Sequence, residues 1–222
     1  FPTRIWRRSK TAADRSYAMR RNAIAALLLG TCLTLPALAD VPTLSGVPCV
    51  STKQMSLSER DVFRLENLTT SRSRGLAGAL LSDSAADRAA VAGIYEAGLS
   101  PLASIVEGKY QCRTIKLGGL GALTVYGWFE CEIGRDGDQL TIEKLTGSQR
   151  FSGTLTPAGE GLAYRGALHY WDEESRPYEG ASDRDQVGCL LKAFEDGEPF
   201  VLELPFPAFE SAHDVIELRS RR

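Results

Sequence analysis

The polar stretch 144–150 places two cations and two hydrogen-bonding side chains within seven residues. Lys144 and Arg150 can attract an anionic group, while Ser148 and Gln149 can form neutral hydrogen bonds with hydroxyl groups. One interpretation of this stretch is therefore the polar floor or rim of a site for an anionic or hydroxylated ligand.

Two carboxylates near the C-terminus, Glu210 and Asp214, suggest another role for these cations. If the fold is a closed barrel, its terminal strands meet, and Lys144 and Arg150 could form an internal ion-pair network with the two acids. The acids could also be the paired carboxylates of an envelope polysaccharide hydrolase, but nothing in the sequence places them on opposite sides of a substrate. We name no catalytic residue. The candidate ligand-binding residues are Lys144, Ser148, Gln149, Arg150, Arg113, Glu210 and Asp214.

Common catalytic and metal-binding motifs are absent from the sequence. It contains no G-x-S-x-G, H-E-x-x-H, Walker lysine or dinucleotide-binding motif, and no C-x-x-C pair that could hold zinc. His169 and His213 are the only candidates for a base at neutral pH, and each lies where a surface or boundary strand residue is expected. Asp136 and Asp138 flank a glycine in a predicted hairpin turn, which we prefer to a calcium loop. We predict neither a cofactor nor a metal.

The N-terminal segment has the pattern of a secretory signal peptide. Met19 and the two arginines after it form a basic start, residues 23–35 form an apolar run, and Ala37-Leu38-Ala39 matches a cleavage site. We interpret residues 1–18 as an upstream extension and expect cleavage after Ala39. The predicted product is periplasmic or secreted and has no integral membrane segment.

Composition after this cleavage restricts the possible partners. Residues 40–222 retain 19 of the 26 basic and 27 of the 28 acidic residues, a formal net charge of −8. Because nucleic-acid binding depends on lysine and arginine neutralising phosphates, this charge argues against a nucleic-acid partner. The expected partner is a small ligand or a periplasmic protein.

Four cysteines remain after cleavage, an even number in a chain bound for an oxidising compartment. We favour a disulfide between Cys112 and Cys131, because they flank a glycine-rich turn and would lie on adjacent antiparallel strands. A second bond between Cys49 and Cys189 would then tie the N-terminal segment to the body of the protein.

Alternating apolar residues predict about eight strands after residue 108. The clearest alternation is over 123–133. Leu140 and Ile142 predict an inward-facing residue at position 144, but that residue is Lys144, which implies a bulge or turn at Gly147. Short strands without intervening helices favour a mainly β, antiparallel barrel of about eight strands, with a two-sheet sandwich as the alternative. Aromatic residues on these strands could stack on a sugar, although strands and cores also favour them: Tyr126, Trp128, Tyr164, Tyr170 and Trp171. The predicted strands are 109–117, 123–133, 139–145, 149–155, 162–170, 186–193, 199–204 and 212–219.

Two helices are predicted before the strands. Ser58 with Asp61 and Ser84 with Asp87 have the spacing of helix N-terminal caps, and each pair precedes apolar residues at helical spacing. The expected organisation is a signal segment over 1–39, an irregular lead-in over 40–55, a helical preface over 56–104 and a barrel over 105–222.

Several segments together resemble a known family, the exported bacterial family catalogued as domain of unknown function 4893. They are the run Gly108–Leu117, Trp128-Phe129-x-Cys131, the stretch 144–150, and the ending Pro205-x-Pro207-x-Phe209-Glu210-Ser211-x-x-Asp214 that continues to Leu218. The resemblance covers most of residues 40–222; it implies export and carries no activity with it. The chain also has a weaker likeness to lipocalin-like barrels, since a predicted helix precedes Gly108-x-Tyr110 at the first strand. Lipocalins have tryptophan where this chain has Tyr110, so the likeness applies to the fold alone.

The sequence favours a periplasmic, disulfide-bonded barrel that binds a small ligand or a protein without catalysis. One alternative is an inhibitor or accessory partner of a cell-envelope enzyme that uses exposed loops such as 172–186. The other is the polysaccharide hydrolase that would use Glu210 or Asp214.

Overall fold

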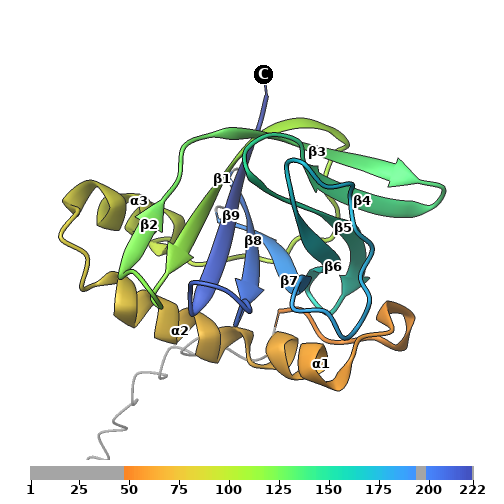
Figure 1. Cartoon of the computed structure of the whole chain (residues 1–222), viewed down its shortest axis with the longest axis horizontal. Helices are drawn as coiled ribbons and strands as arrows, with labels where there is room; N and C mark the ends of the chain where they lie inside the picture. Colours follow the sequence, from red (N-terminus) through yellow and green to blue (C-terminus); the bar gives the residue numbers. More distant parts are fainter. Residues whose placement is uncertain (1–47, 194–198, 222) are drawn as a thin grey trace, which may run out of the picture. The chain divides into compact units, whose positions relative to one another are not determined.

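The computed structural model describes residues 48–193 and 199–221. The predicted signal peptide, with its start at Met19 and its cleavage after Ala39, lies outside these residues. Three α-helices come first, and nine antiparallel strands follow them (Figure 1). The strands are β1 (Gly108–Leu117), β2 (Leu123–Val125), β3 (Phe129–Asp136), β4 (Gln139–Lys144), β5 (Gln149–Ala158), β6 (Gly161–Tyr170), β7 (Asp185–Lys192), β8 (Phe200–Pro205) and β9 (His213–Ser220).

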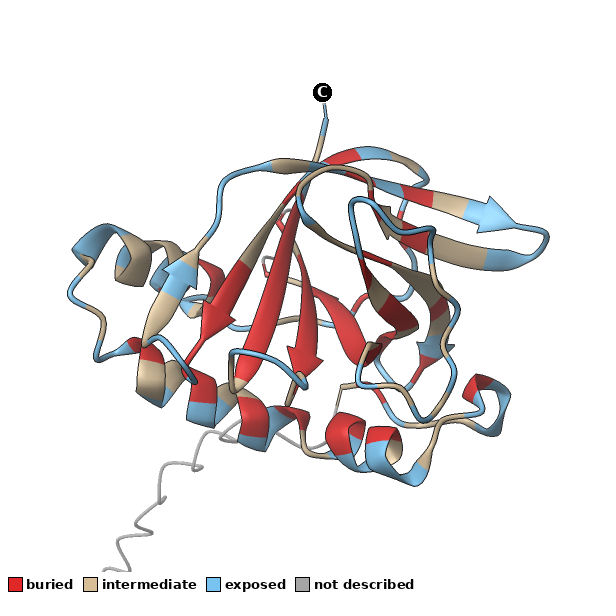
Figure 2. Cartoon of the chain, in the orientation of Figure 1, coloured by how far each residue is buried: buried red, intermediate tan, exposed pale blue. Residues whose placement is uncertain are grey.

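Eight of the strands form a closed barrel. Strands β3 to β9 pair in sequence order, β1 pairs with β3 on one edge, and its other edge pairs with β9. The predicted antiparallel eight-stranded barrel is confirmed, and closure excludes the sandwich. The β3–β4 hairpin extends beyond the barrel wall, and its tip is exposed (Figure 2).

The single strand predicted over 123–133 is wrong, because the segment forms two strands. β2 pairs with the C-terminal part of β1, whereas β3 pairs with the N-terminal part of the same β1 edge. Residues 126–128 connect the two pairings. Leu123 and Val125 therefore pack against the helices outside the barrel, while the alternating residues of β3 face its interior.

The helical segment contains one helix more than predicted. Its helices are α1 (Glu59–Glu66), α2 (Leu68–Ala79) and α3 (Ala85–Tyr95), and a short 3-10 turn (Lys53–Met55) precedes them. α1 and α2 are consecutive and meet at Asn67, which interrupts the apolar pattern that predicted one helix. Both predicted caps are present, since Ser58 and Ser84 accept hydrogen bonds from the backbone N–H groups of Asp61 and Asp87. Within the described ranges, no helix has the length and apolar character needed to span a membrane.

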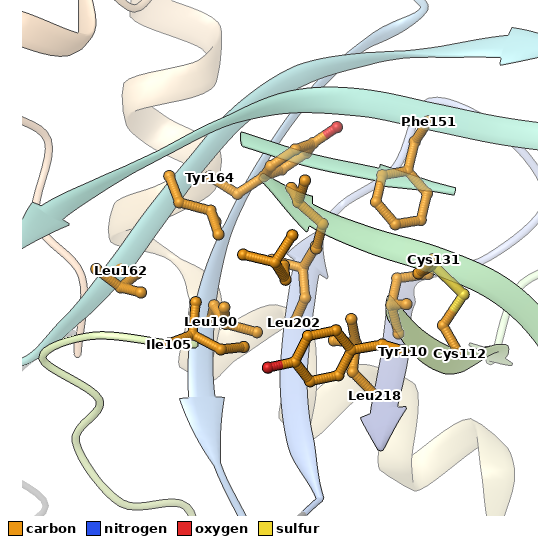
Figure 3. Packing of buried hydrophobic residues seen from close by; sticks show 14 of the residues in the cluster. Ile105, Tyr110, Cys112, Cys131, Phe151, Leu162, Tyr164, Leu190, Leu202 and Leu218 are labelled. Atoms are coloured by element: carbon orange, nitrogen blue, oxygen red, sulfur yellow. A yellow bond between two sulfur atoms is a disulfide. The ribbon is translucent and has the colours of Figure 1, made fainter. Parts of the chain in front are cut away.

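Apolar side chains fill the barrel interior. Figure 3 shows Tyr110, Phe151, Tyr164 and Leu202 converging there, with the bond between Cys112 and Cys131 at one side. Strands β7, β8 and β9 and the C-terminal end of β1 are also buried on their outer faces, because α1 packs on β7 and α2 packs on β1, β8 and β9 (Figure 1). Two apolar layers therefore hold the fold together, one inside the barrel and one beneath the helices.

Both predicted disulfides are present. Cys112 and Cys131 lie on β1 and β3 with a Cα–Cα distance of 5.8 Å. They are displaced diagonally rather than directly opposite, since Cys112 pairs with Phe129 and Cys131 with Tyr110. Cys49 is bonded to Cys189 on β7 across a sequence separation of 140 residues.

A buried carboxylate joins the helices to the outer barrel wall. Glu203 on β8 accepts hydrogen bonds from Arg72 of α2, with Nε 2.6 Å from Oε1, and from the Tyr95 hydroxyl of α3 at 2.9 Å. His213 on β9 lies 3.3 Å from the same oxygen. Burial alone would raise the pKa of Glu203, but the hydrogen bonds from Arg72 and His213 outweigh it and lower that pKa to about 2.

Replacing this carboxylate should destabilise the fold in a pH-dependent way. We expect Glu203→Gln to lower the free energy of unfolding at pH 7 by about 3–5 kcal/mol, because it leaves the Arg72 guanidinium without its buried counter-ion. The folded-state pKa is lowered, so the stabilisation is complete above the ordinary value of 4.5 and is lost as the pH falls towards 2. Urea unfolding at several pH values should show the difference between wild type and variant shrinking over that range. The exposed Glu130, replaced by Gln, is the control and should shift stability by less than about 1 kcal/mol.

A pair of glycines makes room for the largest fully buried side chain. Gly153 on β5 and Gly166 on β6 are paired, and a Cβ atom on either would overlap the ring of Tyr164. The Tyr164 hydroxyl donates to the Ser152 carbonyl oxygen at 3.1 Å. The ring can lie flat along the barrel wall only because neither paired residue has a side chain.

Gly166→Ala should therefore lower the free energy of unfolding by about 1–3 kcal/mol through overpacking. The matched control is Gly93→Ala in α3, where a Cβ would meet no atom within 4 Å. Because alanine is the better helix former, this control should be neutral or stabilising by up to about 1 kcal/mol. Equal effects of the two substitutions in thermal unfolding would contradict this explanation.

Candidate functional site at the barrel mouth

One end of the barrel interior is polar. Strands β1, β4, β5, β7 and β9 direct polar side chains into this end, which we call the barrel mouth and define by Thr114, Lys116, Lys144, Gln149, Gln186 and Asp214. Two hollows there share Gln149 in their lining, one of about 300 Å³ and one of about 90 Å³. The candidates that line the mouth or its rim are Lys144, Ser148, Gln149, Arg150, Glu210 and Asp214.

The seventh candidate, Arg113, lies elsewhere. On β1 it alternates with the inward residues Cys112 and Thr114, so its side chain points out of the barrel. Its Nε is 2.6 Å from Glu217 Oε2, and its guanidinium lies 4.8 Å from the ring centre of Trp128. Arg113 therefore belongs to an outer ion pair and is not part of the mouth.

Lys116 is the central cation of the mouth. Barrel closure pairs Lys116 with Asp214, and the ammonium lies 3.4 Å from Asp214 Oδ2 and 3.0 Å from Glu210 Oε2. Burial favours the neutral amine, but the two carboxylates outweigh it and raise the pKa of Lys116. Burial also raises the pKa of Asp214, although Lys116 and a hydrogen bond from Ser211 oppose that rise. The predicted ion-pair network with the two acids exists, but its cation is Lys116 rather than Lys144 or Arg150.

The β8–β9 loop carries Glu210 to the mouth. Gly119 in the β1–β2 turn has a φ of +102°, and a Cβ there would overlap the backbone of Glu210 and Ser211. The Leu120 N–H donates to the Glu210 carbonyl oxygen at 2.8 Å. Glu210 itself has a φ of +70°, a left-handed conformation that is strained for a residue with a side chain. The close approach to Gly119 thus holds Glu210 where its carboxylate reaches Lys116.

Lys144 faces the interior, as the two-residue period from Leu140 predicts. Of the bulge or turn expected at Gly147, the structure has a turn, since β4 continues to Lys144 and Gly147 follows with a φ of +92°. The Lys144 ammonium donates to the Gln149 carbonyl oxygen at 2.8 Å and lies 4.0 Å from the ring centre of Phe129. Burial and the positive charges of Lys116 and Arg150 lower the pKa of Lys144 to about 8.

Three important residues of the mouth were not among the predicted ones. Thr114 and Lys116 alternate with Ile115 and Leu117, and because the C-terminal end of β1 is buried on both faces, alternation there could not show which set faces inward. Gln186 also lines the mouth, and its side-chain oxygen is buried without a hydrogen-bond partner. The polar residues Lys109, Gln111 and Arg113 on the same strand hid this signal for Thr114 and Lys116, and Gln186 follows the polar Asp185 at the start of β7.

The two histidines are buried, contrary to the expected surface or boundary positions. His213 lies 2.9 Å from the Ser71 hydroxyl and contacts Glu203 outside the barrel, so it belongs to the contact between helices and strands. His169 is on β6 and lies 3.2 Å from the Tyr170 carbonyl oxygen. Among residues 48–193 and 199–221, no three histidine, cysteine, aspartate or glutamate side chains cluster as a metal site would require.

A separate hollow of about 450 Å³ lies between α2 and α3. Its lining is mainly apolar and includes Leu76, Leu80 and Val91. Ligand sites usually combine apolar walls with a few converging polar groups, and the barrel mouth has that combination. We therefore take the mouth as the candidate site.

Comparison with known proteins gives one match. The model of a family described as Domain of unknown function (DUF4893) matches residues 54–218. No curated protein and no solved structure matches the chain. The matched region includes all nine strands up to Leu218 and every residue that defines the mouth.

The altered pKa of Lys144 can be measured directly. In protein labelled with ¹³C at the lysine ε position, the Lys144 signal, assigned from its loss in Lys144→Gln, should titrate near pH 8. An ordinary lysine titrates near 10.4. Since the folded-state pKa is lowered, Lys144 should make the fold more stable as the pH rises from about 8 to about 10. A measured pKa of about 10 or above would contradict the burial and charge environment described above.

Proposed function

The chain belongs to the DUF4893 family, and we propose that it binds a small hydroxylated ligand in the mouth of its barrel. We further propose that it does so in the periplasm. The signal-like pattern that ends at Ala39 and the two disulfides support that location. The family carries no activity that could be transferred, so the proposal is based on the geometry of the mouth.

The observation that carries the proposal is the mixture of donors and acceptors inside a closed barrel. An eight-stranded barrel is either filled by side chains or holds one small ligand. Here the Lys116 ammonium is balanced by Asp214 and Glu210, and the amides of Gln149 and Gln186 lie beside this group. A hydroxyl group both donates and accepts, so it can satisfy the partnerless oxygen of Gln186 and also contact a balanced ion pair.

Apolar side chains at the rim complete this site. Leu120, Tyr170 and Phe209 line the larger hollow, and each is substantially exposed. Exposed apolar and aromatic groups beside a polar floor suit a sugar or polyol, which has carbon–hydrogen faces as well as hydroxyls.

The observations do not favour the two alternatives. Glu210 and Asp214 both contact the same ammonium, so they do not flank a substrate as the two carboxylates of a glycoside hydrolase do. For the accessory-partner alternative, residues 172–184 are mostly exposed, but the segment is attached to α1, since the Tyr178 hydroxyl donates to Asp61 at 2.7 Å. Exposure alone does not indicate a partner.

Binding should depend on Gln186. The test titrates glucose, N-acetylglucosamine and glucitol into the protein while NMR follows the side-chain amides of Gln149 and Gln186. At least one probe should shift both signals saturably, and Gln186→Leu should weaken its binding by roughly tenfold through loss of one buried hydrogen bond. Gln111→Leu, on the exposed outer side of β1, is the matched control and should bind as wild type does.

Native mass spectrometry of protein purified gently from the periplasm provides an independent measurement. A defined mass above that of the disulfide-bonded chain would support a resident ligand. If the bare chain were the only species and none of the three probes shifted either glutamine, the proposed function would be wrong.

A further inference from the structure

The smaller hollow of the mouth is surrounded by hydrogen-bond donors. Its volume is about 90 Å³, and no carboxylate lines it. The lining residues are Thr114, Tyr126, Phe129, Lys144, Ser148 and Gln149. This chemistry differs from that of the adjoining larger hollow, where Glu210 and Asp214 supply negative charge.

Lys144 is a buried cation without a counter-ion. In the described part of the chain, no carboxylate oxygen lies within 4.0 Å of its ammonium. One of its three N–H groups binds the Gln149 carbonyl oxygen, and the Phe129 ring lies on another side. Since burying an unpaired charge is costly, a bound anion would gain more here than at an exposed lysine.

The charged groups around Lys144 also favour the binding of an anion. Lys116 of β1 and Arg150 of β5 both oppose protonation of Lys144. The acids of the neighbouring β9 strand and β8–β9 loop, Asp214 and Glu210, contact Lys116 instead. β3 contributes the aromatic face of Phe129. Lys144 therefore faces cations, an aromatic ring and neutral groups, while the nearby negative charge is engaged by Lys116.

Three residues with hydroxyl groups line the same hollow. Among the described residues, the side chains of Thr114, Tyr126 and Ser148 have no hydrogen-bond partner. Each hydroxyl can donate one hydrogen bond, so together with Lys144 they form a set of donors from β1, the β2–β3 connection and the β4–β5 turn. Charge-assisted hydrogen bonds from such a set suit the oxygens of an anion.

From this arrangement we infer that the hollow beside Lys144 binds an oxyanion, the carboxylate or phosphate of an acidic sugar or related polyol. The inference rests on the proposed function and specifies its ligand: hydroxyls occupy the larger hollow and the anionic group occupies the smaller one. The two hollows share Gln149 in their linings, and the proposal places one small molecule across both.

Three sugars that differ at one carbon test the charge preference. Glucose, glucuronate and glucose 6-phosphate carry a neutral, a carboxylate and a phosphate group at the same position. Isothermal titration calorimetry should show at least one charged sugar binding roughly tenfold or more tightly than glucose, the effect of one charge-assisted contact. Comparing the two charged sugars identifies the preferred oxyanion.

Lys144→Gln should abolish this preference, so that the two charged sugars bind the variant no more tightly than glucose does. The matched control is Lys109→Gln, an exposed position on the same β1 strand as Thr114, which should retain the preference. If Lys144→Gln fails to fold, Ser148→Ala removes one donor at the turn and should reduce the preference by a few-fold. Sodium acetate and sodium phosphate, added to wild type, should shift the Lys144 ¹³C signal saturably and raise its pKa.

The outcomes separate this inference from the proposed function. Equal binding of all three sugars would overturn the oxyanion site while the hydroxyl site remained. A Lys144 signal that responds to acetate or phosphate, with no sugar bound, would support the oxyanion site and count against the hydroxyl site. No response to either anion and no sugar binding would overturn both.

Discussion

Pairing of β1 with β9 is the constraint on which the rest of this structure depends. It joins eight residue pairs, from Tyr110 with Ser220 to Leu117 with His213, and it converts a meandering sheet into a barrel. The register also decides which charges meet, because it places Lys116 opposite Asp214 inside and Arg113 opposite Glu217 outside. A shift by one residue would move each side chain to the other face, so the ion pair of the mouth and the apolar interior depend on one register.

Part of the barrel wall is buried on its outer face as well as on its inner face, and this determines which residues the strands contain. A barrel wall with solvent outside needs apolar residues only on alternate positions, but here α1 and α2 cover the outer faces of β7, β8, β9 and the C-terminal end of β1. The outer layer contains its own charges, and Glu203 is stabilised there by side chains from two helices and a strand. The mouth is the place where the interior becomes polar, and it lies at the end of β1 that α2 and the β8–β9 loop approach.

Local patterns predicted the fold well, because alternation and turn residues are properties of short segments. Seven of the predicted strands each correspond to one observed strand, and the eighth, 123–133, failed because its two halves pair with different parts of β1. That division depends on how each half pairs with β1 and leaves no signal in the alternation. Lys144 and Gln149 were found from a polar interruption, whereas Lys116 lies at the end of β1 that is buried on both faces. Arg113 has an equally polar side chain, but its position on β1 points it outwards to Glu217.

The two disulfides are nested, since the bond from Cys49 to Cys189 encloses the one from Cys112 to Cys131. A chain that becomes available for oxidation from its N-terminus therefore exposes the thiol of Cys112 to Cys49 well before Cys189 emerges. Pairing in order of appearance would trap a non-native bond, and its correction requires thiol–disulfide exchange. For a chain oxidised in this order, β7 must be present before Cys49 can form its native bond, and a disulfide isomerase would accelerate that step.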